Sequence, residues 1–175
     1  MSKQRLVSVI MSTYNSEDTL EESINSILDQ TYLDIEILIM DDGSKDNSNV
    51  ILDRLSIQNK SIKILRNETN IGLTKSLNIL ISKSRGQYIA RHDADDISAY
   101  DRLYKQLSYL ENNKNISVLG SYAYKINKDG KTIGKINKQI KNKKLLYYEN
   151  LLIHPSTMFV KRIFYEVGEY NENLM

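Results

Sequence analysis

Three carboxylates stand within four residues, Asp93, Asp95 and Asp96, directly after the apolar run 87–91. Carboxylates packed this closely repel one another unless a positive group binds, and a divalent cation with oxygen ligands is a natural partner. In an extended segment Asp93 and Asp95 share one side, so a metal held there could also bind a diphosphate and neutralise the charge of a departing phosphate. The alternative is that Asp96 or Ser98 caps the next helix and the other carboxylates face solvent.

A second acidic pair, Asp41 and Asp42, precedes Gly43 and Ser44. A carboxylate at the end of a strand can accept a hydrogen bond from the imide N–H of a base or from a ribose hydroxyl. Asp, Gly and Ser are also turn formers, and taken alone this motif favours a turn followed by a helix cap.

Several other polar groups follow apolar runs or open helical patterns. The residues after the first run can present polar atoms to a nucleotide or form an ordinary cap. A helix opening at Asn70-Ile71-Gly72 would offer free backbone N–H groups to an anion, and nearby cations could reach phosphate. These candidates are Thr13, Tyr14, Asn15, Asn70, Gly72, Lys75 and Arg91.

The elements that must position these groups alternate between strand and helix patterns. Apolar, β-branched runs predict buried strands over 6–11, 35–40, 62–65 and 87–91. Apolar residues at helical spacing predict helices between them, the first capped by Asn15 or Ser16 and the third ended by Gly86 in a left-handed conformation. This order predicts an α/β, Rossmann-like fold with a mainly parallel sheet flanked by helices. Ligands bind beyond the carboxyl ends of such strands, where the acidic clusters lie.

The pattern changes in the second half of the chain. Two apolar stretches, 116–126 and 131–136, bracket Lys128-Asp129-Gly130, which predicts a hairpin and an antiparallel part of the sheet. The segment 145–152 predicts a short helix. His154 precedes the only proline, Pro155, and could line an acceptor site or begin a turn.

Composition excludes several classes of protein. The 175 residues, 41% of them apolar, are enough for a packed domain, and 24 basic against 22 acidic residues argue against a dedicated nucleic-acid binder. No cysteine is present, which fits a reducing, cytoplasmic setting. No signal peptide or membrane-spanning run is expected, whereas peripheral membrane contact through lysine-rich surfaces is compatible with the sequence.

The chain resembles the family 2 glycosyltransferases, inverting enzymes with the GT-A fold, over nearly its whole length. Each matching stretch is weak by itself, but their number and order are specific. The stretches are Val9 to Asn15, Ile39 to Asp46, Asn70-Ile-Gly72, Ser76-Leu-Asn78, Gly86 to Ser98, Arg102-Leu103 and His154 to Phe159.

The resemblance implies one glycosyltransferase domain over 1–175, with a nucleotide-sugar-binding half, 1–98, and the start of an acceptor-binding half, 99–175. It implies that Asp95 is the direct ligand of Mn²⁺ or Mg²⁺, with Asp93 near the metal and ribose and Arg91 near the diphosphate. The nucleoside is expected against the segment Thr13 to Asn15 and either Asp41 or Asp42, with Ala94 also in the nucleotide site. Residues expected on the acceptor side are His154, Ser156 and Thr157.

The implied reaction transfers a sugar with inversion, from a UDP-sugar to a glycan or lipid-linked glycan acceptor. The expected setting is bacterial capsule or other surface-polysaccharide assembly, in the cytoplasm at the inner face of the membrane. The sequence does not indicate the sugar, the acceptor or the oligomeric state.

Two departures from the family pattern stand out. Ser12 replaces the usual proline, and the catalytic base is expected beyond Met175, which suggests a truncated chain. One alternative is therefore a fragment that binds nucleotide sugar and metal but cannot transfer. A more remote alternative is phosphoryl transfer by an aspartate, although that chemistry expects a functional lysine on a later strand and the motif on an earlier one.

Overall fold

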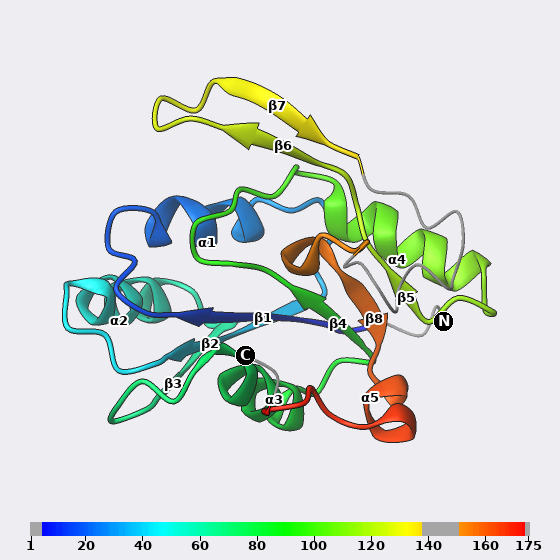
Figure 1. Ribbon diagram of the computed structural model, residues 1–175, viewed down its shortest axis with the longest axis horizontal. Helices are drawn as coiled ribbons and strands as arrows, with labels where there is room; N and C mark the ends of the chain where they lie inside the picture. The colour runs from blue at the N-terminus through cyan, green and yellow to red at the C-terminus, as the bar shows by residue number, and fades with distance from the viewer. Residues whose placement is uncertain (1–4, 138–150, 174–175) are drawn as a thin grey trace.

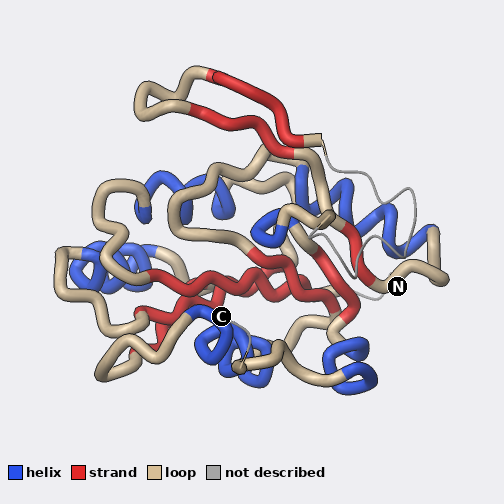
Figure 2. The backbone as a smooth tube through the Cα atoms, viewed as in Figure 1, coloured by secondary structure: helices blue, strands red, loops and turns tan. Residues whose placement is uncertain are grey.

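The computed structural model describes residues 5–137 and 151–173, and its centre is a six-stranded sheet (Figures 1 and 2). The strand order is β3-β2-β1-β4-β8-β5. The first four strands in this order are parallel, whereas β8 runs antiparallel to both β4 and β5. The strands are β1 (Val7–Thr13), β2 (Ile35–Asp41), β3 (Ile62–Arg66), β4 (Tyr88–Arg91), β5 (Val118–Leu119) and β8 (Met158–Val160). The predicted α/β fold with a mainly parallel sheet is confirmed.

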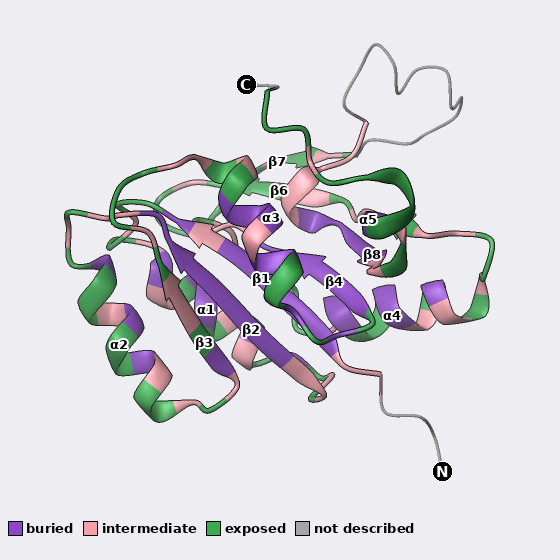
Figure 3. Ribbon diagram, turned by 90° about the horizontal axis from the view of Figure 1, so that it is seen from below, coloured by how far each residue is buried: buried purple, intermediate pink, exposed green. Residues whose placement is uncertain are grey.

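Helices cover both faces of the sheet and create two cores. Alternate residues of the buried strands point to opposite faces, so Val9 joins one core and Ile10 the other. One core packs against α1 (Leu20–Leu28), α2 (Ser48–Gln58) and α4 (Arg102–Asn112). The other packs against α3 (Leu73–Lys83) and α5 (Arg162–Val167), which lie in front of the buried strands in Figure 3. This three-layer arrangement explains why the central strands read as continuous apolar runs.

The second half adds short elements to this framework. A 3₁₀ turn, η2 (His154–Ser156), leads into β8. The predicted hairpin is confirmed as a separate two-stranded ribbon of β6 (Ala123–Ile126) and β7 (Thr132–Ile136), whose turn contains Gly130 at φ 73°. The helix predicted over 145–152 lies mostly outside the described residues. Among those residues, no helix is long and apolar enough to cross a membrane.

Two local predictions are wrong, and so is the alternative in which Asp96 or Ser98 caps a helix. The cap of α1 is neither Asn15 nor Ser16, because the helix begins at Leu20 after Thr19. Neither Asp96 nor Ser98 caps α4, which begins after Asp101. The predicted end of α3 is the other error.

Gly86 does not end α3 in a left-handed conformation, because the helix stops at Lys83 and Ser84 is extended. The glycine is needed for close approach instead. A Cβ at this position would lie 2.6 Å from both the backbone nitrogen and Oγ of Ser8. The backbone of the segment before β4 therefore packs directly against β1.

A buried carboxylate ties the amino-terminal ends of these strands together. Glu36 of β2 is only 2% exposed. It accepts hydrogen bonds from Ser8 Oγ at 2.7 Å, Lys63 Nζ at 3.1 Å, and Arg85 N and Nε at 2.6 and 2.9 Å. Burial alone would raise the pKa of Glu36, but these donors outweigh it and lower the pKa to about 2.

We expect Glu36→Gln to weaken the fold. The pKa falls from 4.5 to about 2 on folding, so the ionised group stabilises the protein above pH 4.5, and this stabilisation is lost as the pH falls toward 2. The shift corresponds to about 3 kcal/mol at neutral pH. Urea denaturation as a function of pH should show a loss of this order at neutral pH and a smaller difference from wild type in acid. Equal stability of the variant and wild type at neutral pH would contradict this role, and Glu166→Gln, on the exposed surface of α5, is the control.

Candidate nucleotide-sugar and metal site

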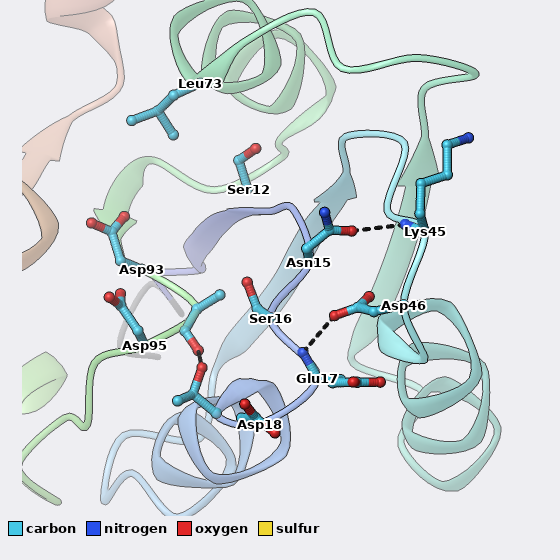
Figure 4. Close-up of a pocket in the computed structure, with 12 residues that line it drawn as sticks. Ser12, Asn15, Ser16, Glu17, Asp18, Lys45, Asp46, Leu73, Asp93 and Asp95 are labelled. Atoms are coloured by element: carbon cyan, nitrogen blue, oxygen red, sulfur yellow. Dashed lines mark hydrogen bonds between the residues drawn. The ribbon is translucent and has the colours of Figure 1, made fainter. Parts of the chain in front are cut away.

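A cleft opens where the order of the strands reverses. The chain passes from β1 to β2 and β3 on one side and returns to β4 on the other side, so β1 and β4 flank a topological switch point. The cleft has a volume of about 810 Å³ at this edge of the sheet. Figure 4 shows Asp93 and Asp95 on one side, with Asn15, Lys45 and Asp46 on the other. Its lining residues are Ser12, Asn15, Ser16, Glu17, Asp18, Thr19, Lys45, Asp46, Leu73, Asp93, Ala94 and Asp95.

The wall after β1 is held by the loop after β2. Asn15, at φ 51°, donates from its backbone N–H to Ser44 Oγ at 3.0 Å and accepts from the backbone N–H of Lys45 at 2.8 Å. Glu17 continues the pairing, because its N–H donates to Asp46 Oδ2 at 3.0 Å. The Asp41-to-Ser48 region therefore braces the loop that follows β1 as well as ending its own strand.

Hydrogen bonds from a polar stripe on α1, which also includes residues just before and after the helix, hold the opposite wall. Thr19 Oγ1 donates to the carbonyl of Ala94 at 2.9 Å, and Ser23 Oγ donates to the carbonyl of Asp93 at 2.8 Å. Further along the stripe, Ser26 Oγ accepts from the N–H of Ser98 at 3.0 Å. The backbone of the acidic loop is thus fixed by hydroxyls, which leaves the carboxylates of Asp93 and Asp95 free to border the cleft.

Gln30 completes this stripe from a buried position. Its Nε2 donates to the carbonyl of Ala99 at 2.8 Å, and its Oε1 accepts from the N–H of Leu103 at 3.0 Å. One side chain therefore connects the end of α1 to the first turn of α4. The residues at 19, 23, 26 and 30 recur at helical spacing and face one segment.

Two buried guanidinium groups lie beneath the acidic loop. Arg91 is 2% exposed, and its Nη2 lies 2.8 Å from Asp93 Oδ1. Arg102 donates from Nη2 to the carbonyl of Arg91 at 3.2 Å and from Nη1 to the carbonyl of Pro155 at 3.3 Å. Burial lowers the pKa of Arg102 to about 10 despite the attraction of Asp96, so Arg102 carries positive charge at neutral pH.

The carboxylates remain crowded despite these cations. Burial raises the pKa of Asp93, with Asp95 adding to the rise and Arg91 opposing it. Burial and then the charges of Asp93 and Asp95 raise the pKa of Asp96 to about 6. A cation at Asp93 and Asp95 would relieve this repulsion.

The donor set fits a metal that shares its coordination with a ligand. Within residues 5–137 and 151–173, no group of three or more acidic, histidine or cysteine side chains could hold an ion alone. Mg²⁺ and similar cations commonly bind one or two carboxylates together with water and substrate phosphates. Asp93 and Asp95 on one cleft wall provide that arrangement, whereas Arg91 is buried beneath them, pairs with Asp93 and does not line the cleft.

Both acids at the end of β2 are buried, and neither lines the cleft. Asp42 is 2% exposed, with Oδ1 accepting from the N–H of Ile71 at 3.0 Å and Oδ2 from that of Gly72 at 2.9 Å. The same Oδ1 accepts from Asn67 Nδ2 at 2.7 Å. Asp41 accepts through Oδ1 from the N–H of Ser44 at 3.0 Å. Both carboxylate oxygens of Asp42 are thus engaged within the protein.

These contacts change the role of the segment before α3. The N–H groups of Ile71 and Gly72, predicted to attract an anion, donate to Asp42 instead. Asn70 and Lys75 are exposed and do not line the cleft. Thr13, the last residue of β1, is buried, and its Oγ1 lacks a partner. Of the two residues that follow, Tyr14 is exposed and Asn15 lines the cleft.

The histidines occupy different environments. His92 is buried, and burial followed by the charge of Arg102 lowers its pKa to about 3, so it is a neutral group of the core. His154 is half-buried, with Nε2 3.3 Å from the hydroxyl of Tyr170. Burial and then the charge of Arg91 lower the pKa of His154 to about 4.

The other two predicted acceptor-side residues have inward-facing side chains. Ser156 Oγ donates to the carbonyl of Ile153 at 2.8 Å, and Thr157 Oγ1 donates to that of His154 at 2.9 Å. None of His154, Ser156 and Thr157 lines the cleft. Their contact with an acceptor stays a prediction.

The sequence did not predict the residues that hold the walls of the cleft in place. The polar stripe on α1 could have been found from its spacing, because a buried polar face on an otherwise apolar helix needs partners. Lys45 and Asp46 could not have been assigned to the cleft from their types, since exposed charged residues are common in loops.

We expect Gln30→Ala to destabilise the protein by about 2 kcal/mol, because it leaves the carbonyl of Ala99 and the N–H of Leu103 without their partner. Chemical denaturation measures the loss. Gln58→Ala, at the exposed end of α2, should change stability by much less. Equal effects of the two substitutions would contradict the supporting role of Gln30.

Comparison with known proteins places this geometry in a family. The profile of Glycosyl transferase family 2 matches residues 8–168. An uncharacterized glycosyltransferase of Methanocaldococcus jannaschii is 38% identical over 97% of this chain and 60% of its own length. The Escherichia coli protein WfgD, named as a UDP-Glc:α-D-GlcNAc-diphosphoundecaprenol β-1,3-glucosyltransferase, is 38% identical over 67% of this chain and 46% of its own length. The chain thus spans 60% or less of the length of these two relatives.

Solved structures agree in fold. The mannosyltransferase PcManGT of Pyrobaculum calidifontis, solved with GDP-Man and Mn²⁺, superimposes with a TM-score of 0.76 at 16% identity, over 98% of this chain and 49% of that one. TarS of S. aureus, solved with UDP, gives a TM-score of 0.75 at 22% identity, over 96% and 51%. With its α/β sheet, its cleft at the switch point and its match over residues 8–168, the chain belongs to Glycosyl transferase family 2 and has the GT-A fold.

Proposed function

We propose that this chain holds a UDP-sugar and a divalent metal for an inverting glycosyl transfer in surface-polysaccharide assembly. The observation that carries the proposal is the pairing of Asp93 and Asp95 on one wall of the switch-point cleft, above the buried Arg91. Five carboxylates line this cleft, against one lysine. A diphosphate would be repelled from it unless a cation accompanied the ligand.

The choice of nucleotide and metal is supported by relatives. WfgD is named for a UDP-Glc donor, and TarS was solved with UDP. PcManGT was solved with GDP-Man and Mn²⁺, which supports Mn²⁺ as the metal and makes GDP the competing nucleotide. We infer UDP because WfgD, at 38% identity, is a nearer relative than PcManGT at 16%.

Each residue of the site then has a defined task. Asp95 and Asp93 would hold the metal, and Arg91 orients Asp93 through their 2.8 Å ion pair. When bound, the metal supplies positive charge that stabilises the diphosphate leaving group. Asn15, braced by the loop at Ser44 and Lys45, would border the nucleoside. No residue is assigned here as the base that deprotonates the acceptor hydroxyl.

The acceptor and the setting belong to the same proposal. WfgD is named for a diphosphoundecaprenol-linked acceptor, which supports a lipid-linked glycan and catalysis at the inner, cytoplasmic face of the membrane. A chain that binds the donor and metal without transferring is the second candidate, because no base is proposed among the residues that the structure describes. Family membership leaves no support for the phosphoryl-transfer alternative.

Thermal melting with UDP, GDP and ADP, each with and without Mn²⁺, tests donor binding. Ligand that binds only the folded state should stabilise it by about 2.7 kcal/mol at a hundredfold excess over Kd. We expect a rise in Tm that is selective for UDP and requires Mn²⁺. Asp95→Asn should abolish the metal-dependent part, because one of the two carboxylates proposed to hold the metal is lost.

Glu166→Gln, which removes an exposed carboxylate on α5, should leave the rise intact. A rise that survives in Asp95→Asn, or that appears equally without Mn²⁺, would contradict the metal site. No rise with any nucleotide would contradict the donor site itself.

The two acids at the end of β2 should separate in the same assay. Both oxygens of Asp42 accept hydrogen bonds from backbone N–H groups. Asp42→Asn replaces one of these acceptors with an NH₂ donor, so it should lower the free energy of unfolding by about 2 kcal/mol. Asp41 is also buried and outside the cleft lining, and it accepts a hydrogen bond through one oxygen, so Asp41→Asn should change stability less. A contact of its carboxylate with the base or ribose predicts that the same substitution lowers UDP affinity about tenfold. Unchanged UDP affinity in Asp41→Asn would exclude that contact.

A further inference from the structure

The β6–β7 ribbon has two unlike faces. Across the pair, Tyr124 lies opposite Lys135 and Ala123 opposite Ile136, so these pairs point to opposite sides. Tyr124 and Ile133 are 62% and 67% exposed, whereas Ala123 and Ile136 are half-buried. Tyr124 and Ile133 thus place aromatic and aliphatic surface on the exposed face, although Ile136 lies on the half-buried one.

The same ribbon is strongly basic. Residues 120–137 carry four exposed lysines and one aspartate, a net charge of +3 within a chain whose total is +2. In Figures 1 and 2 the ribbon stands apart from the six-stranded sheet, with the turn at its outer end. The exposed lysines are Lys125, Lys128, Lys131 and Lys135.

The aromatic rings on this face already contact a cation. Lys135 Nζ lies 5.3 Å from the ring centre of Tyr122 and 5.6 Å from that of Tyr124. Ring faces engaged by an ammonium group do not offer the open platform that stacking on a sugar requires. Tyrosine with lysine and an exposed aliphatic residue is instead the combination that suits the boundary between water and lipid.

We propose that the exposed face of the β6–β7 ribbon docks on an anionic lipid bilayer. Lysines beside the turn would lie near the headgroups, and Tyr124 and Ile133 would enter the interface. An anionic polymer would match the charge but would leave the apolar side chains in water, so the bilayer accounts for both properties. The inference rests on the ribbon alone and does not require the proposed transfer reaction.

Co-sedimentation with vesicles tests the proposal in the absence of nucleotide. The protein is mixed with vesicles of phosphatidylcholine alone and of phosphatidylcholine with phosphatidylglycerol, at low and high salt. We expect binding to the anionic vesicles only, weakened by salt. Each lysine near the surface contributes roughly fivefold, so Lys128→Gln with Lys131→Gln should reduce partitioning roughly 25-fold.

A second variant and a control separate the ribbon from general charge. Tyr124→Ser with Ile133→Ser should reduce partitioning about tenfold without a change in charge. Lys60→Gln with Lys83→Gln, exposed lysines outside the ribbon, should reduce it far less than the ribbon pair. Melting of each variant, with and without UDP and Mn²⁺, reports folding and donor binding independently of the lipid result.

Three outcomes would overturn the proposal. Wild-type protein could fail to bind anionic vesicles, including the case in which it binds soluble dextran sulfate instead. Both ribbon variants could bind as wild type does. The control pair could lose as much binding as the lysine pair in the ribbon. Any of these would leave the donor-site measurements unaffected.

Discussion

The placement of negative charge at the carboxyl end of β4 is the constraint on which the site depends. Three carboxylates follow this strand within four residues, and they are tolerated because Arg91 and Arg102 are buried beneath them. The Arg102 guanidinium is held by the carbonyls of Pro155 and Arg91, so η2 and β4 help to position it, whereas Arg91 is paired with Asp93. The loop therefore presents Asp93 and Asp95 from a rigid base, and the remaining repulsion favours a cation.

A second constraint comes from the helix that faces this loop. One face of α1 is apolar and packs against the sheet. The polar stripe donates hydrogen bonds from the hydroxyls of Thr19 and Ser23 to the carbonyls of Ala94 and Asp93. Because the hydroxyls bind the backbone, the carboxylate side chains remain available to a ligand. The loop after β2 fixes the opposite wall of the cleft, because it accepts hydrogen bonds from the backbone of Asn15 and Glu17. The cleft is thus shaped by hydrogen bonds between loops that are distant in sequence.

Much of the fold could be predicted because it depends on local patterns. Buried parallel strands read as apolar runs, amphipathic helices show their spacing, and the Asp-Gly turn predicts the hairpin. The positions of the strand ends also predict that Asp93, Asp95 and Asn15 border the same cleft. The predictions that failed concern residues whose roles depend on contacts between segments distant in the sequence. Gly86 is required by the backbone of Ser8, and the N–H groups before α3 are taken by Asp42, neither of which a single stretch of sequence reveals.

In the proposed site, Asp93, Asp95 and a nucleotide diphosphate hold the metal jointly. Electron paramagnetic resonance of Mn²⁺ tests it directly, because the signal of the free aqueous ion falls as Mn²⁺ binds. The account predicts weak binding to the protein alone and tight binding, one ion per chain, once UDP is added. Tight binding without UDP, or no binding with it, would contradict a shared metal at Asp93 and Asp95.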